Sequence, residues 1–208
     1  MKKLVYAILA LAFLMPAVAT AKTPLQKARE KAHKEKLKEY KKEGWKPMGS
    51  KTMDVLLLEH YNKLDQLGEN GHEVEGISTR TKSLNTGKQM AINNAVVTYG
   101  QEAGSTLQGR VVADMSANGV DTDGEFENFF AAYERLVEKE IRGEMQPSYT
   151  IQKANGDGTY EIRTYFIVEE NAAQKARLRA LEEAMQNSQV AADHAEKISN
   201  FVRQGLDE

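Results

Sequence analysis

The sequence predicts an α+β protein: a small antiparallel sheet of about three strands, helices packed on one face of it, and helical extensions at the N- and C-terminal ends. The sheet is indicated by a turn, Asn155 to Gly158, between two segments rich in β-branched and aromatic residues, 148–153 and 159–168. The helices are indicated by apolar residues at helical spacing, most clearly over 125–142. Strands and helices do not alternate regularly along the chain, which favours a two-layer α+β domain.

The first 21 residues have the pattern of a cleavable secretory signal peptide. Lys2 and Lys3 precede an apolar run over 4–18, and Ala19 to Ala21 supplies the small-x-small pattern that precedes cleavage. The apolar run is shorter than the roughly 20 residues of a membrane span. We therefore expect Lys22 to be the mature N-terminus and no transmembrane segment to remain. The protein would be periplasmic or secreted, or associated with the outer membrane without lipidation, because the chain has no Cys to lipidate.

Charge divides the mature chain into a basic arm and an acidic body. Residues 22–46 hold ten Lys/Arg and four Glu, whereas residues 47–208 hold sixteen Lys/Arg and twenty-six Asp/Glu. An acidic body would repel phosphate, so we expect no nucleic-acid partner. The predicted organisation is a signal peptide (1–21), a basic helical arm and loop (22–46), an α+β body (47–170) and a C-terminal helix (171–208).

The basic arm is predicted to be a solvated helix that ends at Gly44 and adds little to the stability of the body. Trp45, the only Trp, is expected to pack its loop against the body. The candidate interaction surface consists of Lys34, Lys38, Lys41, Lys42 and Trp45. Its positive charge suits an anionic lipid or a cell-wall polymer, and an envelope protein is the third possible partner.

The remaining elements are predicted from capping residues and apolar spacing. In chain order they are a helix over 51–67 capped by Ser50, a strand over 73–82, a helix over 86–115, a helix over 125–142 capped by Thr122 with Glu125, the hairpin, and one helix from Asn171 to Arg203. Gly100, Gly104 and Gly109 are expected to mark close approaches to another element. The 125–142 helix is expected to lie on the hairpin sheet.

No catalytic, cofactor-binding or metal-binding set of residues stands out. The four His residues lie in separate segments without the i, i+4 spacing of a metal-binding helix, and Cys is absent. Residues 44–52 resemble a phosphate-binding loop with Ser50 inserted before Lys51, and a loop leading into a helix explains them better. We therefore expect no cofactor and no metal.

Several features together resemble a known family. They are the signal peptide, the Lys/Glu-rich segment that ends in Lys42-Glu-Gly-Trp45-Lys-Pro, the Leu-rich helix, the Ala-rich helix around 91–103, and the strand that ends in Tyr165-Phe-Ile-Val168. The chain resembles small exported proteins of Bacteroides-type bacteria, which look related to the Helicobacter-type membrane lipoprotein domain and to the N-terminal domain of the flagellar H-ring protein. This resemblance implies an α+β envelope domain without a known active site, and the missing lipidated Cys departs from the lipoproteins.

The sequence thus favours a non-enzymatic exported envelope protein that binds or assembles with another envelope component. Two alternatives remain. A hydrolase would need two carboxylates brought together in one apolar cleft, and a small-molecule carrier would need a closed apolar cavity.

Overall fold

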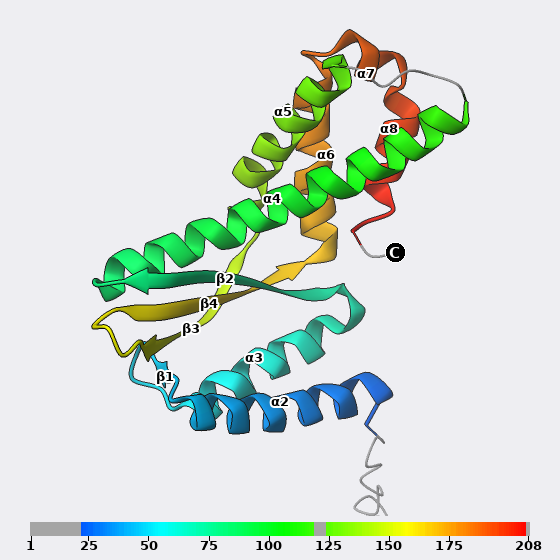
Figure 1. Cartoon of the computed structure of the whole chain (residues 1–208). Helices are drawn as coiled ribbons and strands as arrows, with labels where there is room; N and C mark the ends of the chain where they lie inside the picture. Colours follow the sequence, from blue (N-terminus) through cyan, green and yellow to red (C-terminus); the bar gives the residue numbers. More distant parts are fainter. Residues whose placement is uncertain (1–21, 119–123, 207–208) are drawn as a thin grey trace, which may run out of the picture.

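The computed structural model describes residues 22–118 and 124–206 (Figure 1). Its elements are, in chain order, α2 (Pro24–Glu43), β1 (Lys46–Pro47), α3 (Met53–Leu67), a 3-10 turn (Gly68–Asn70), β2 (Gly71–Thr81), α4 (Leu84–Ala117), α5 (Gly124–Ile141), β3 (Gln146–Ala154), β4 (Tyr160–Glu169), α6 (Glu170–Met185), α7 (Gln189–Asp193) and α8 (Ala195–Arg203).

The strands form one antiparallel sheet in the order β1-β3-β4-β2, which confirms the α+β class. The hairpin that the turn at Asn155 to Gly158 predicted is confirmed as β3 and β4, and it occupies the centre of the sheet. The sheet has one strand more than expected, because Lys46 and Pro47 pair with Gln152 and Ile151 of β3. The two-residue length of β1 leaves most of the outer edge of β3 to other neighbours.

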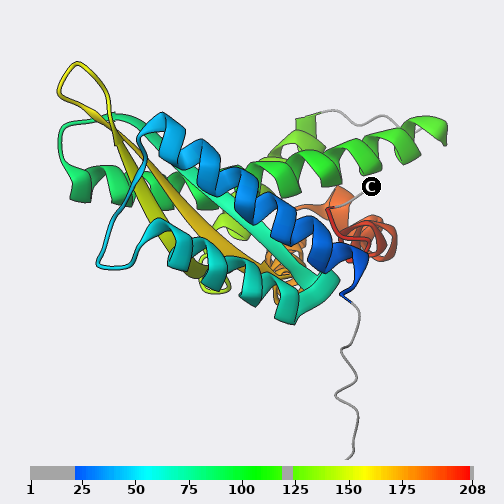
Figure 2. The ribbon, with the colours of Figure 1, turned by 90° about the horizontal axis from the view of Figure 1, so that it is seen from below.

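Helices cover both faces of the sheet, so the prediction of helices on one face is wrong. Figure 1 shows α4 above the sheet and α3 below it, and Figure 2 shows α2 beside α3 on the lower side. The physical reason lies in β4, where four consecutive residues from Tyr165 to Val168 are buried. Because successive side chains of a strand point to opposite faces, such a run needs a cover on each side.

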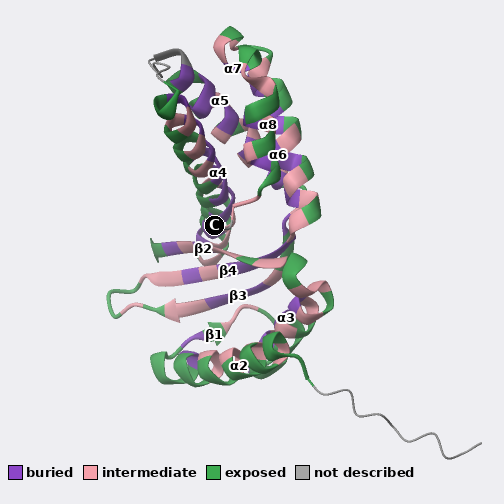
Figure 3. Ribbon diagram, turned by 90° about the vertical axis from the view of Figure 1, so that its right-hand side faces the viewer, coloured by how far each residue is buried: buried purple, intermediate pink, exposed green. Residues whose placement is uncertain are grey.

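The buried apolar side chains form two clusters, one for each face. The larger cluster joins α4, α5, α6 and α8 to Phe166 and Val168 of β4. The smaller cluster lies below the sheet, and Figure 3 shows buried residues in both places. Its members are Tyr40, Trp45, Met53, Leu57, Tyr149, Ile151 and Tyr165.

Helix α5 packs between α4 and α6 rather than on the hairpin sheet, contrary to our expectation. In Figure 1, α5, α6 and the C-terminal half of α4 extend together beyond the sheet. The aromatic stripe of α5 is buried as expected, with Phe126 1% and Phe130 5% exposed. Its partners are helices because α4, at 34 residues, is long enough to cover the sheet and then continue beside α5.

The predicted single C-terminal helix is divided into three. Helix α6 ends at Met185, and Ser188 caps α7 by accepting a hydrogen bond from the Ala191 N–H. Helix α8 then runs back along α6 and α4 (Figure 1). Reversal buries Ile198 and Val202 in the larger cluster, which a straight helix would leave in water.

Two of the three predicted close approaches are confirmed. A side-chain carbon at Gly100 or Gly104 would meet Glu134 or Glu138 of α5. Gly109 has no neighbour within 4 Å at that position, so the expectation is wrong there. The closest approach lies at Gly76 of β2, where such a carbon would lie 1.9 Å from the Ala91 carbonyl oxygen.

One predicted helix N-cap is wrong, and another falls outside the residues that the structure describes. Thr52, not Ser50, accepts the hydrogen bond from the Val55 N–H and begins α3. Thr122, the expected cap of α5, lies outside the described residues.

Candidate functional site

The outward side of α2 carries a continuous row of exposed lysines, which we call the lysine face: Lys27, Lys31, Lys34, Lys38, Lys41 and Lys42. The first five follow one another at alternating spacings of four and three residues, which places them on one side of a helix. At 1.5 Å per residue the row is about 22 Å long. It contains the four lysines of the predicted interaction surface. Lys27 and Lys31 were missed, although the same spacing rule identifies them.

The opposite side of α2 is docked on the body. Arg29 donates to the carbonyl oxygens of Leu64, at 2.6 Å, and Gly68, at 2.9 Å, at the end of α3. Tyr40 is 1% exposed and its hydroxyl donates to that of Tyr165 at 2.8 Å. The arm is therefore an integral layer of the fold, and the expectation of a solvated helix is wrong. The number of apolar residues in the helix did not indicate this docking, because only Tyr40 and Leu37 bury apolar surface. Polar contacts make up the remainder of the interface.

A polar network joins α2 and α3 to the sheet. Lys36 Nζ donates to Glu73 Oε1 at 3.0 Å and lies 4.9 Å from the centre of the Tyr165 ring. On the other side of Glu73, His60 Nε2 lies 2.6 Å from Oε2, an ion-pair distance without hydrogen-bond alignment. His60 is 1% exposed, and its Nδ1 lies 2.8 Å from Ser148 Oγ of β3.

This network shifts the pKa values of its two charged members in opposite directions. Burial by itself would raise the pKa of Glu73, but contacts with His60 and Lys36 outweigh burial and hold that pKa below its usual value. Burial would lower the pKa of Lys36, yet Glu73 holds it above its usual value. Both shifts favour the charged pair, which joins α2 to β2 on the side away from the lysine face.

Trp45 does not belong to the exposed surface, contrary to its place in the predicted interaction site. It is 5% exposed, and its ring lies under Lys153, with Nζ 4.5 Å away, and Arg163, at 4.7 Å. Its indole N–H donates to Glu43 at 3.0 Å. The expectation that Trp45 packs its loop against the body is confirmed, and the same burial removes it from partner recognition.

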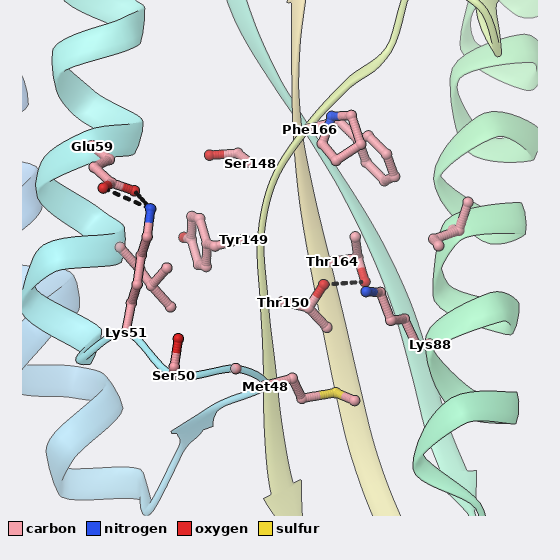
Figure 4. Close-up of a pocket in the computed structure, with 14 residues that line it drawn as sticks. Met48, Ser50, Lys51, Glu59, Lys88, Ser148, Tyr149, Thr150, Thr164 and Phe166 are labelled. Atoms are coloured by element: carbon pink, nitrogen blue, oxygen red, sulfur yellow. Dashed lines mark hydrogen bonds and ion pairs between the residues drawn. The ribbon is translucent and has the colours of Figure 1, made fainter.

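A groove of about 420 Å³ lies between α3 and α4 and is bordered by the β1–α3 loop (Figure 4). The loop is the segment that resembles a phosphate-binding loop. Thr52 at the end of this loop caps α3, which confirms the simpler interpretation as a lead into that helix. Lys51 binds Glu59 with distances of 2.6 and 2.7 Å. Sequence reasoning missed the groove residues Lys88, Thr150 and Thr164, because they come from α4, β3 and β4 and no local pattern connects them.

Neither alternative function finds its required geometry in this groove. Its lining includes one carboxylate, Glu59, which Lys51 already binds, whereas the hydrolase needs two. A carrier needs a closed apolar cavity, but the groove is bordered by exposed residues such as Gly49 and Ser50. Within 22–118 and 124–206, no group of three or more His, Asp or Glu side chains is placed to hold a metal ion.

No helix in the described part of the chain has both the length and the apolar content to cross a membrane. Comparisons with protein-family models, with curated proteins and with solved structures found no match.

Proposed function

We propose that this chain is a non-enzymatic exported envelope protein that attaches, through the lysine face of α2, to an anionic lipid surface. The observation that carries this proposal is the row of six exposed lysines on a helix whose other side is fixed to the body. Charges gathered along one side of a docked helix suit a flat anionic surface, because they can approach it together. Each lysine near such a surface contributes about 1 kcal/mol.

Attachment through this face would be electrostatic, without insertion of the helix. The exposed residues between the lysines are small or charged, and Leu25, at the start of α2, is the one large exposed apolar side chain of this helix. An inserting helix needs a broad apolar face. Binding should therefore weaken steeply as salt is added, since the Debye length falls from about 10 Å at 0.1 M to about 3 Å at 1 M.

Vesicle sedimentation tests the proposal with a matched pair of variants. Lys34→Gln with Lys38→Gln removes two charges from the lysine face, and Lys82→Gln with Lys175→Gln removes two exposed lysines elsewhere. We expect the mature protein to bind vesicles rich in phosphatidylglycerol and not vesicles of phosphatidylcholine. The first variant should bind about tenfold or more weakly, and the second should resemble the parent. Equal losses in both variants, or binding only to a soluble polyanion such as polyphosphate, would show that the lipid assignment is wrong.

Export is tested separately by the N-terminus of the protein in its native host. Cleavage after Ala21 predicts that sequencing reads Lys-Thr-Pro-Leu. Helix α2 would then begin two residues from the new terminus, with Thr23 as its cap. An intact Met1 in membrane fractions would contradict export and, with it, the envelope assignment.

A further inference from the structure

The groove between α3 and α4 exposes a part of the sheet that no strand covers in the described chain. Strand β1 pairs with Gln152 and Ile151 of β3, and the Met48 N–H donates to the Thr150 carbonyl at 2.9 Å. The chain then turns away at Gly49, which has φ of +150°. Residues 147–149 of β3 thus have β4 on one side and the groove on the other.

One cationic group in the groove has no counter-charge. Lys88 reaches from α4 toward the hydroxyls of Thr150 and Thr164 (Figure 4), and it forms no ion pair or hydrogen bond with any described residue. Lys51 at the opposite rim is already neutralised by Glu59. The groove therefore carries one uncompensated positive charge, which calls for one carboxylate in a ligand.

Two buried hydroxyls line the same groove, on the side toward which Lys88 points (Figure 4). Thr150 Oγ1 and Thr164 Oγ1 lie 3.3 Å apart, and the two residues are 8% and 2% exposed. A bond between two hydroxyls uses one of their two O–H donors, so the second O–H is free for another acceptor. A carboxylate between Lys88 and this pair would receive an ionic contact and a hydrogen bond from groups already in place.

The other residues that line the groove indicate which chemical groups a ligand should carry beside its carboxylate. Met48, Leu56, Ile92 and Phe166 supply apolar surface, which an apolar side chain would cover. Ser50 and the edge of β3 are polar, and a simple fatty acid would offer these groups no hydrogen-bond partner. A peptide backbone satisfies such groups by pairing with the strand edge. Pro147 and the bulge after it limit this pairing to a few residues, which fits the end of a chain rather than a long strand.

We propose that this groove binds the C-terminal residues of a partner polypeptide, with the terminal carboxylate at Lys88, Thr150 and Thr164 and the last apolar side chain against Ile92 and Phe166. The site lies apart from the lysine face, so it would let one surface attach the protein while another holds a protein partner.

Fluorescence polarisation on the mature full chain tests the assignment. The probe is a set of N-terminally labelled hexapeptides that end in leucine, with either a free or an amidated C-terminus. We expect the free acids to bind at least tenfold more tightly than the amides. Lys88→Gln should abolish that difference, while Lys175→Gln, at an exposed position of α6, should preserve it.

Further arms of the experiment separate competing interpretations. Equal binding of acid and amide, or an unchanged preference in Lys88→Gln, would refute the terminal-carboxylate site. Competition by octanoate as effective as by unlabelled peptide would assign the groove to small carboxylates and overturn the peptide assignment. Lys88 is half-buried at the surface, so its variant should keep the parent melting temperature. Vesicle binding should be unaffected by Lys88→Gln, which makes failure here independent of the lysine face.

Discussion

Single glycines decide how closely α4 approaches its neighbours. At Gly76 of β2 an added carbon would overlap the Ala91 carbonyl oxygen, which belongs to the backbone and cannot rotate away. At Gly109, in the same long helix, the corresponding position is open. Both positions hold glycine, but the effect of each glycine on the free energy of unfolding depends on its surroundings.

The two glycines should respond to alanine with opposite signs. Gly109→Ala is expected to stabilise the protein by about 0.5–1 kcal/mol, because alanine is the better helix former and meets nothing. Gly76→Ala should destabilise it by about 1–3 kcal/mol, because the sheet and α4 must separate. Urea unfolding of both variants measures these differences. A stabilised Gly76→Ala protein would contradict the close packing of α4 on β2.

The Lys36–Glu73 pair predicts a specific pH dependence. The pKa of Glu73 is lower in the folded state, so its contribution to stability is present above the unfolded carboxyl value of about 4.3 and is lost as the pH falls through the folded value. The pKa of Lys36 is raised, so its contribution is present below about 10.4 and is lost as the pH rises through the folded value. Between about pH 5 and pH 10 both contributions are present.

Glu73→Gln removes the carboxyl group whose protonation lowers the stability at acidic pH. We expect the melting temperature of the parent to fall more steeply than that of the variant between pH 5 and pH 3, measured by circular dichroism. Glu35→Gln, at an exposed position of α2, serves as the control and should keep the parental slope. Identical slopes in the parent and in Glu73→Gln would show that the pair does not couple α2 to the sheet.

At the scale of elements, α2 illustrates how a helix with little apolar surface can still be part of a core. Most of its residues are polar, and Tyr40 is its one buried residue. The Tyr40 ring lies 6.2 Å from that of Trp45. Polar contacts add to this burial: Arg29 donates to the Leu64 carbonyl of α3, and Lys36 pairs with Glu73 of β2. Such helices are difficult to distinguish by composition from free arms.

Removing residues 22–43 should therefore destabilise the body, against the sequence-based expectation that the arm adds little to its stability. The deletion would uncover Tyr165, leave Glu73 without Lys36, and remove the contacts of Arg29 from the end of α3. We expect the melting temperature to fall by about 5 °C or more, since 1 kcal/mol corresponds to about 2–4 °C at this chain length. If the deletion variant does not fold, Tyr40→Ala provides a milder loss. An unchanged melting temperature in Tyr40→Ala would restore the picture of a free arm.

At the scale of the whole molecule, one apolar cluster unites the sheet with the helices beyond it. Phe130 of α5 and Phe166 of β4 belong to the same cluster although α5 does not lie on the sheet. Helix α4 makes this possible, because it packs on β2 and β4 and then on α5. Damage at either end of the cluster should consequently weaken the entire fold.

Phe130→Ala or Phe166→Ala should each cost about 3–5 kcal/mol, a large share of the roughly 5–15 kcal/mol that stabilises a domain. Leu58→Ala is the control, because Leu58 is 49% exposed on α3, and it should lose much less. His60→Ala should also be costly, because His60 is buried among Glu73, Ser148 and Tyr149. Urea titrations that show both Phe variants as stable as the parent would refute the shared cluster.

Features that depend on neighbouring residues were accessible from the sequence by itself. The hairpin turn, the α+β class, the approximate helices and the row of lysines on α2 follow from spacing and turn chemistry, which act over a few residues. The export signal remains a prediction of the same local kind. The tertiary structure decided the two-sided cover of the sheet, the docking of α2 and the position of α5. It also decided the reversal at α7 and the groove that Lys88, Thr150 and Thr164 line together. Each of these depends on contacts between distant segments, where many pairings of apolar faces satisfy the same local pattern and only the packing of the complete chain selects one.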